Sequence, residues 1–330
     1  MRSELGRFAA VAVTALAACG GGGGGEKPQD GGLLPSTVDC KAGSSTIQGT
    51  FVSPSGTIAV AGGVVTVSTA AGCKVGTDKN GAFTFRQVPS STATVTATKG
   101  LFSASSEAVP GVPVEVRIDP ASVQIGYVAG EYDSIEAVVQ RLGFTPAALD
   151  ASDLAGTAVG QLDVLLLDCG MDEGYATDVD AIGNLRSFVQ GGGVLYASDF
   201  AFVYVDAVWT GKIHFLPDSA QYPDGPYLGD AADGLQATVA DPALRLALGK
   251  DTAAIDFDLS DWVVVDSVAS GVAVLLSGPA PLTLGTTLPN RPYAVQFADG
   301  SGRVTYTSFH NEVQTTADVD RLLEQMLLGL

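Results

Sequence analysis

A continuous apolar run at Val164–Leu167 constrains the fold of this chain more than any other feature. Four aliphatic residues in succession leave no polar face, which is typical of a strand buried on both sides of a parallel sheet. Apolar residues at helical spacing lie before and after this run, at Ile135, Val138, Val139 and Leu142 and at Val179, Ile182, Leu185, Phe188 and Val189. Alternating strands and helices predict a three-layer α/β domain with a mostly parallel sheet over residues 120–330.

Further strands of this domain are predicted from short apolar runs at 123–128, 194–197, 262–265, 272–276, 293–297 and 304–307. An amphipathic helix is expected to close the chain through Val319, Leu322, Leu323, Met326, Leu327 and Leu330. Residues 200–260 are rich in Asp, Gly and Pro. They are interpreted as an insertion near the carboxyl edge of the sheet, where the binding loops of such folds gather.

Residues 45–119 have a different pattern, in which short β-branched runs are separated by Gly, Pro, Asn or Ser. This pattern predicts a small β-sandwich, and Asn80-Gly81 favours a tight hairpin. The segment Thr77–Phe85, followed by Val88-Pro89, resembles the carboxypeptidase regulatory-like domain, which has a carbohydrate-binding-like fold. That resemblance implies a non-catalytic spacer or binding module, and a stalk for the larger domain is the simplest interpretation.

The N-terminus indicates export. Arg2 and Arg7 precede the apolar run 8–18, which is too short to span a bilayer and is typical of a signal peptide. The run ends Leu16-Ala17-Ala18-Cys19-Gly20, which resembles the bacterial lipoprotein cleavage signal. The resemblance implies removal of residues 1–18, a lipid on Cys19 and, because Gly20 follows, outer-membrane sorting. An ordinary signal peptide is the alternative.

Residues 19–44, rich in Gly and Ser, are predicted to form a flexible linker behind that lipid anchor. An exported compartment permits disulfides, so Cys40 and Cys73, both near turn-rich sequence, are expected to form one. Cys169 ends an apolar run and is expected to be a small buried hydrophobic side chain.

Two motifs near the predicted strand ends could carry chemistry. The segment Phe188–Ser198 contains Gly191-Gly192-Gly193 followed by a strand, and it resembles the class I glutamine amidotransferase-like fold. Counting from the glycines puts Ser198 at the family's nucleophilic cysteine. The segment Thr307–Glu312 resembles the family's F-H-P-E motif, so His310 and Glu312 match its catalytic pair. Gly170 and Met171 lie where the family offers an oxyanion hole.

This sequence departs from the family pattern at several positions. The family's elbow is G-x-C-x-G, whereas this chain has Tyr196–Phe200 with no glycine and with serine in place of cysteine. Asn311 replaces the motif's proline. Two functions follow as alternatives: a non-catalytic binding or interaction protein with a degenerate site, or a serine hydrolase or acyl transferase using Ser198, His310 and Glu312.

Composition excludes several classes of partner. The chain has 330 residues, 17 Lys and Arg against 36 Asp and Glu, and a formal net charge of −19, so a nucleic-acid backbone would be repelled. No phosphate-binding glycine motif follows a strand, and therefore no nucleotide or other cofactor is predicted. With two histidines and four cysteines the spacing indicates no metal site. Asp256, Asp258 and Asp261 could bind Ca²⁺, but a solvated strand edge is the commoner case.

Several residues in or beside the predicted insertion could contact a ligand. Asp199 adjoins the candidate nucleophile, and aromatic side chains at Trp209, Tyr222 and Tyr227 could stack on a sugar or peptide. The expected partners are the membrane, through the lipid on Cys19, and an envelope polysaccharide or protein. His214, which has aromatic neighbours, is interpreted as structural.

Overall fold

The parallel strands predicted from apolar runs form one half of a nine-stranded sheet. The computed structural model describes residues 33–216, 227–283, 285–311 and 316–329. In spatial order the parallel strands are β10 (Ala147–Leu149), β9 (Ile125–Val128), β11 (Val164–Leu167), β12 (Val194–Ser198) and β21 (Gly302–Thr307). All four residues of β11 are buried, as its unbroken apolar run requires.

The other half of this sheet is antiparallel, which corrects the prediction of a mostly parallel sheet. It consists of β20 (Thr287–Asp299), β19 (Ala273–Pro281), β15 (Ala232–Val239) and β16 (Thr252–Phe257). Only Gly300 and Ser301 separate β20 from β21, with Gly300 at φ +60°, and so short a loop allows an antiparallel hairpin alone. β15 and β16 belong to residues 200–260, so much of the predicted insertion lies in the sheet.

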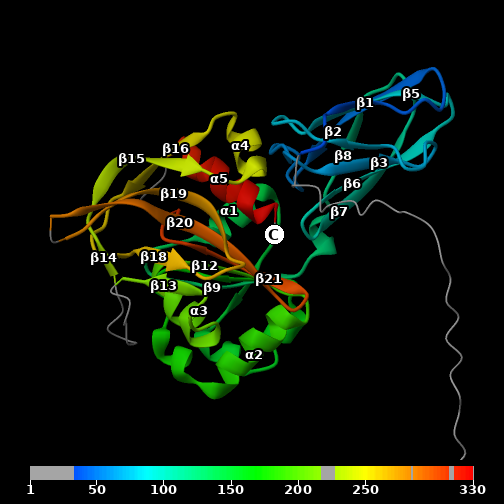
Figure 1. The fold of residues 1–330 in the computed structure, drawn as a ribbon. Coiled ribbons are helices and arrows are strands. Elements are labelled where there is room, and N and C mark those ends of the chain that lie inside the picture. Colours follow the sequence, from blue (N-terminus) through cyan, green and yellow to red (C-terminus); the bar gives the residue numbers. More distant parts are fainter. Residues whose placement is uncertain (1–32, 217–226, 284, 312–315, 330) are drawn as a thin grey trace, which may run out of the picture. The chain divides into compact units, whose positions relative to one another are not determined.

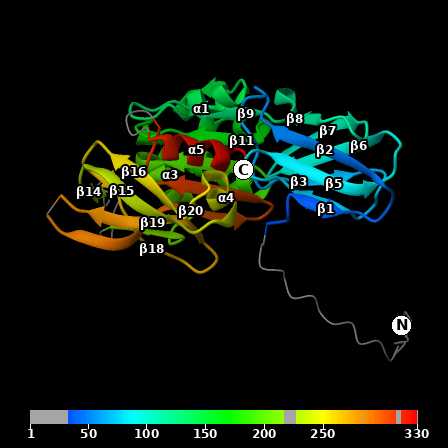
Figure 2. The ribbon, with the colours of Figure 1, turned by 90° about the horizontal axis from the view of Figure 1, so that it is seen from above.

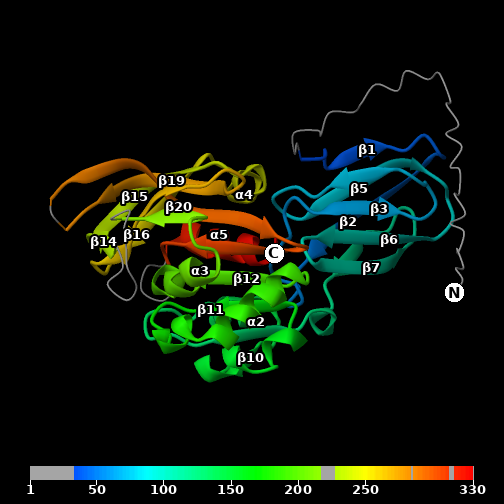
Figure 3. The same cartoon turned by 60° about the horizontal axis from the view of Figure 1, so that its bottom comes forward.

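Helices cover both faces of the sheet, which gives three layers (Figures 1 and 3). Alternate strand residues point to opposite faces. Leu166 and Tyr196 share a core with α1 (Ile135–Leu142) and α5 (Ala317–Leu327), whereas Leu165 and Leu195 share another with α2 (Val179–Gln190) and α3 (Phe202–Val208). Viewed from above, the red helix α5 runs along the sheet (Figure 2). The remaining helical elements are α4 (Pro242–Leu248), η1 (Pro120–Ser122), η2 (Ala151–Ala155), η3 (Val159–Gln161), η4 (Glu173–Thr177) and η5 (Asp199–Ala201).

The amphipathic stripes agree with the helices except at one position. The buried residues of α1 are Ile135, Val138, Val139 and Leu142, as predicted. In α2 the predicted Val179 is instead 79% exposed. Asp178 caps this helix by accepting from the N–H groups of Asp180 and Ala181, so Val179 is the first helical residue and turns away from the sheet. The buried face of α2 begins at Ala181.

Residues 37–117 contain two four-stranded sheets. One has the order β1 (Thr37–Asp39), β5 (Ala82–Val88), β2 (Ser45–Val52), β8 (Val114–Arg117). The other has the order β4 (Lys74–Gly76), β3 (Val64–Val67), β6 (Ala93–Lys99), β7 (Phe102–Ala108). β1 pairs with β5 inside the region predicted as linker, so the ordered part of the chain begins before residue 45. Two small sheets pair β13 (Ile213–Phe215) with β18 (Val265–Val268), and β14 (Tyr227–Gly229) with β17 (Trp262–Val263).

The turn at Asn80-Gly81 connects two sheets and does not form the predicted hairpin. β4 pairs with β3, while β5 pairs with β1 and β2. Asp78 Oδ1 accepts from the N–H groups of Asn80 at 2.8 Å and Ala82 at 2.9 Å, which tightens the turn. Gly81 is needed because its φ is +72° and a Cβ there would lie 2.4 Å from the Phe51 carbonyl oxygen.

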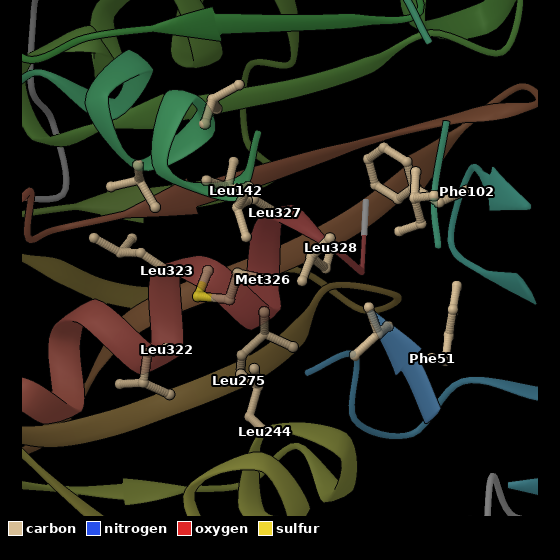
Figure 4. Close-up of a cluster of buried hydrophobic side chains, with 14 of the residues drawn as sticks. Phe51, Phe102, Leu142, Leu244, Leu275, Leu322, Leu323, Met326, Leu327 and Leu328 are labelled. Atoms are coloured by element: carbon tan, nitrogen blue, oxygen red, sulfur yellow. The ribbon is translucent and has the colours of Figure 1, made fainter. Parts of the chain in front are cut away.

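The apolar core runs without a break from the N-terminal sheets into the larger sheet. Phe51 and Phe102 belong to the same buried cluster as Met326 and Leu327 of α5 (Figure 4). Gln325 accepts from the Ala61 N–H at 3.1 Å and donates to the Ala59 carbonyl at 3.0 Å. Residues Leu33–Leu330 accordingly form one compact unit, and residues 1–32 lie outside the described chain. Residues 45–119 as an independent domain stay a prediction.

Cys40 and Cys73 form a disulfide with an S–S distance of 2.04 Å. Cys169 is a buried free thiol. Of the helices that the structure describes, none has the length and apolarity to cross a bilayer. Cys19 and the predicted signal peptide lie outside the described residues, so lipidation stays a prediction.

Candidate functional site

Polar residues gather at the carboxyl edge of the parallel strands. Strand pairing aligns Leu167 with Ala197 and Ser198 with Thr307, so the residues that follow β11, β12 and β21 leave the sheet at one edge. These residues are Asp168, Cys169, Asp199, His310 and Asn311, and Asp133 joins them from the loop after β9. All six side chains are buried.

The turn after β12 has its left-handed residue at Asp199, one position later than the predicted elbow at Ser198. Asp199 has φ +41°, and the chain continues through η5 into α3. A left-handed conformation is uncommon outside glycine, although Asp adopts it more readily than most residues. In this alignment the buried Ala197 and Ala201 stand where the family's elbow has glycine. The elbow residue of this chain is therefore an acid and not a hydroxyl nucleophile.

The Ser198 hydroxyl group is held by groups other than His310. Ser198 Oγ donates to Asp133 Oδ2 at 2.5 Å and accepts from the Cys169 N–H at 3.0 Å. The side chain has no exposed surface. In this arrangement the hydroxyl proton points at a carboxylate, and attack on a substrate would first require both hydrogen bonds to break.

Asp133 and Asp168 are site residues that the sequence patterns did not predict. Asp133 also accepts from the N–H groups of Ser134 at 2.9 Å and Asn311 at 3.1 Å. Burial raises the pKa of Asp133 to about 6, and the hydrogen bonds that it accepts oppose this shift. Burial, followed by the charges of Asp133 and Glu136, raises the pKa of Asp168 to about 10. Asp168 directly follows a fully buried strand, and that position is the signal that could have identified it.

Asn311 joins two of these loops. Its side chain accepts from the Ser134 N–H at 3.0 Å and donates to the Ser134 carbonyl at 2.9 Å. Both bonds need an amide, so the proline of the family motif could not replace it here. The departure from the motif therefore has a structural role in this chain.

His310 lies with Cys169 and Asp199. The Cys169 sulfur, a carboxylate oxygen of Asp199 and a ring nitrogen of His310 are all within 4.8 Å of one another, and the three residues are 0%, 2% and 1% exposed. Burial lowers the pKa of His310 to about 4, opposed by the charge of Asp258. Glu312, the third predicted catalytic residue, lies outside the described residues.

Asp199 is oriented by its own hydrogen bonds. Oδ1 accepts from the Val263 N–H at 2.7 Å, and Oδ2 accepts from the Cys169 thiol at 3.5 Å. Burial raises the pKa of Asp199 to about 7. Burial and the charge of Asp199 raise the pKa of the Cys169 thiol well above its usual range. Cys169 is buried as predicted, but its sulfur contacts a polar group.

Gly170 and Met171 do not present the two backbone donors predicted for an oxyanion hole. The Met171 N–H donates to the Asp168 carbonyl at 3.3 Å within a turn. Gly170 has φ +83°, and a Cβ at this position would lie 2.6 Å from the ring of Tyr132. These residues therefore shape the turn after β11 and allow Tyr132 to approach it.

A cavity of about 270 Å³ opens at this edge of the sheet. Aromatic, aliphatic and polar side chains line it: Tyr132, Cys169, Asp199, Phe200, Leu259, Ser260, Asp261, Trp262 and His310. Tyr132 and Leu259 are 43% and 41% exposed at its rim, unusually accessible for large apolar side chains. Asp261 is also exposed, whereas Asp256 accepts from the Gly234 N–H at 2.5 Å.

The predicted aromatic ligand contacts lie elsewhere or outside the described chain. Trp209 is 6% exposed, donates to Asp299 Oδ2 at 2.8 Å and packs on Phe297. Asp299 pairs with Gly302 at the start of β21, so Trp209 lies at the amino edge of the parallel strands, opposite the cavity. Tyr227 begins β14, but its side chain is not described, and Tyr222 lies outside the described residues. Tyr132, Phe200 and Trp262 supply aromatic rings to the cavity instead.

A larger cavity of about 540 Å³ lies at the amino edge of the strands, beside Gly191–Gly193 and Leu162. Its one carboxylate belongs to Asp163, which accepts from the Gln124 N–H at 2.7 Å. With that group engaged, this cavity offers less for chemistry than the one at the carboxyl edge.

No protein-family model matches the chain, and no curated protein sequence matches it. Among solved structures it is similar to a cytoplasmic protein from Salmonella typhimurium at 12% identity and TM-score 0.40, covering 62% of this chain and 97% of that one. A GMP synthase component from Thermoplasma acidophilum matches at 12% and 0.40, covering 63% and 94%. PurLQS from Thermotoga maritima matches at 12% and 0.39, covering 62% and 97%. Similarities of this strength do not establish a shared function.

Proposed function

We propose that this protein is an envelope lipoprotein that binds a ligand in the cavity at the carboxyl edge of its sheet, without catalysing a reaction on it. In this proposal Cys19 carries the lipid anchor on the outer membrane, residues 45–119 act as a stalk, and residues 120–330 form an amidotransferase-like head. The expected ligand is a sugar residue of an envelope polysaccharide.

The observation that carries this proposal is the composition of the cavity. Its rim exposes the ring of Tyr132 and the side chain of Leu259, and Tyr132 lies 6.4 Å from Phe200 between ring centroids. Aromatic rings pack on the apolar face of a sugar, and exposed polar side chains such as Asp261 accept hydrogen bonds from hydroxyl groups. A volume of about 270 Å³ suits a single small group.

The contacts of Ser198 weigh against the alternative of a serine hydrolase or acyl transferase. A serine nucleophile needs a base within hydrogen-bond reach, usually an imidazole. The partners of Ser198 Oγ are a carboxylate and a backbone N–H, and Ser198 is not among the residues that line the cavity. The Met171 N–H is engaged in its own turn, which also weakens the oxyanion hole.

The test is a binding titration of the full-length chain in detergent against soluble oligosaccharides prepared from bacterial envelopes. Tyr132→Ala and Leu259→Ala should each weaken binding at least about tenfold, since each removes an apolar contact worth over 1 kcal/mol. Leu34→Ala is the matched control, because Leu34 is 40% exposed and does not line the cavity.

Two outcomes would overturn the proposal. One is saccharide binding that is absent or equal in all four proteins. The other is covalent labelling of the wild-type chain by a fluorophosphonate probe, lost in Ser198→Ala and His310→Ala, which would establish the hydrolase. Binding of an envelope protein at the same rim, lost in Tyr132→Ala, would replace the polysaccharide by a protein ligand.

A further inference from the structure

Three different metal-ligand atoms meet at the inner end of the cavity. Cys169 follows β11, Asp199 follows β12, and His310 follows β21, so three separate strand ends each contribute one ligand atom. All three residues are buried, and all three line the same cavity. Among the described residues this is the one group of at least three His, Cys, Asp or Glu side chains that approach so closely.

The spacing of these atoms is close to that of a coordination sphere. Tetrahedral Zn²⁺ holds sulfur at about 2.3 Å and nitrogen or oxygen at about 2.0–2.2 Å, which puts neighbouring ligand atoms about 3.3–3.7 Å apart. Cys169 Sγ and Asp199 Oδ2 already lie 3.5 Å apart. The ligand atoms of the full set are within 4.8 Å of one another, so small side-chain rotations complete the geometry.

The donor set selects the class of metal. Thiolate and imidazole are ligands for Zn²⁺ and its neighbours, whereas Mg²⁺ and Ca²⁺ require oxygen ligands throughout. Within this set only Asp199 supplies oxygen.

The surroundings orient two of the ligands. The Val263 N–H holds Asp199 Oδ1 at 2.7 Å, which leaves Oδ2 directed at Cys169. Ser198 Oγ accepts from the Cys169 backbone N–H at 3.0 Å, which fixes the chain at the sulfur-bearing residue. Such outer hydrogen bonds fix ligand orientation in metal sites. They also give Ser198 a positioning role that does not require it to be a nucleophile.

We propose that Cys169, Asp199 and His310 bind one Zn²⁺ ion at the inner end of the cavity. Three protein ligands leave the fourth position directed at the cavity, which is the arrangement of an open zinc site. Binding replaces the S–H bond of Cys169 by a Zn–S bond and releases the thiol proton to solvent. This inference goes beyond the proposed ligand binding and does not depend on it.

The experiment measures metal uptake by the full-length chain in detergent after treatment with a chelator. Zn²⁺ alone is titrated for stoichiometry and affinity, and Co²⁺ is used as a spectroscopic probe because a Co²⁺–thiolate bond gives a charge-transfer band. We expect one ion per chain and a thiolate band. Cys169→Ser and His310→Gln should each lose at least about 100-fold in affinity, more than the loss of an outer-sphere contact.

The chain offers matched controls for both ligands. His214→Gln changes the other histidine, and Cys19→Ser changes the other cysteine outside the Cys40–Cys73 disulfide. Both variants should bind Zn²⁺ like the wild type. Asp199→Asn is a third test variant, since Asn also tolerates the left-handed conformation at φ +41°. Circular dichroism identifies any variant that does not fold, and the remaining variants then decide.

Absence of stoichiometric Zn²⁺ uptake by the wild type overturns the proposal. Uptake that persists in folded Cys169→Ser and His310→Gln, or that is lost in a control variant, overturns it equally. Saccharide binding is measured separately in the presence of chelator, so failure of the ligand proposal and failure of the metal proposal give different results.

Discussion

At the scale of single residues, the most unusual feature of the described chain is the burial of carboxyl groups without a buried Lys or Arg beside them. Asp133, Asp168 and Asp199 are 3%, 0% and 2% exposed, and burial raises the pKa of each. Ion pairs of the described residues, such as Arg141–Asp320 and Lys250–Asp318, lie at the surface. The fold therefore favours the protonated forms of these three acids, and its stability must depend on pH.

Asp133 gives this dependence a definite sign. Its pKa is about 6 in the folded chain against an ordinary value of 3.8, so the unfolded chain loses this proton first as pH rises. Stability from this group is present at about pH 4 and falls by up to about 1.4 kcal/mol per pH unit between pH 4 and 6. Urea unfolding of Asp133→Asn should show a shallower decline across that window than the wild type.

The comparison needs a control, because Asp168 and Glu136 lie near Asp133 and titrate in the same field. Asp233→Asn removes an exposed acid and should keep the wild-type slope. An equal slope in wild type and Asp133→Asn between pH 4 and 6 would contradict the assignment of this decline to Asp133.

At the scale of elements, helix α5 connects the N-terminal strands to the larger sheet. Its apolar face packs beside Phe51 and Phe102, and Gln325 pairs with two backbone groups of the 59–61 loop. The Gln325 side chain is 3% exposed. A buried amide that satisfies both a donor and an acceptor is costly to remove, because both partners stay buried.

Gln325→Ala should therefore lower the free energy of unfolding by about 2–4 kcal/mol, since it leaves the Ala61 N–H and weakens the bonding of the Ala59 carbonyl. Chemical denaturation measures this change. Gln190→Ala is the matched control, because Gln190 is exposed and reaches Asp299 only at 3.4 Å; its effect should stay within about 0.5 kcal/mol. A loss as small as the control's would show that the contact contributes no stability.

The disulfide acts at the same scale by joining the end of β1 to the start of β4. Cys40 and Cys73 are separated by 33 residues, and closing a loop of this length lowers the entropy of the unfolded chain. The double variant Cys40→Ser/Cys73→Ser should lose about 3–4 kcal/mol in the free energy of unfolding, measured by urea titration. The same loss is expected when the wild type is reduced, and stability unaffected by both treatments would contradict this role.

At the scale of the whole molecule, the open question is how the chain is held in the cell. The lipoprotein-like segment ends at Cys19, and Leu33–Leu330 form one compact unit after it. Two or three acyl chains give stable membrane anchoring, and the proposed function relies on such an anchor at Cys19.

Cys19→Ser should shift the protein from the membrane fraction to the soluble fraction of an expressing bacterium. Mass spectrometry of the wild type should show a chain beginning at Cys19 with added acyl mass. Ser3→Ala, which changes the predicted signal peptide outside the cleavage motif, should remain in the membrane fraction. A wild-type chain that begins at Cys19 without added lipid would favour the ordinary signal peptide.

The sequence by itself determined the local elements of this protein. The apolar run of β11, the helical stripes of α1 and α5 and the cap at Asp178 depend on neighbours within a few residues, so their patterns are legible along the chain. Val179 was misassigned for the same reason: the cap places it outside the buried face, and spacing alone does not show where a helix begins.

Only the tertiary structure decided which residues meet. The antiparallel half of the sheet depends on pairing between β15, β16, β19 and β20, and apolar runs do not specify a partner or a direction. The elbow at Asp199 rather than Ser198 is a one-residue difference in backbone conformation, which composition cannot resolve. Cys169, Asp199 and His310 are separated by 30 and 111 positions, and they converge because parallel strands end at a common edge.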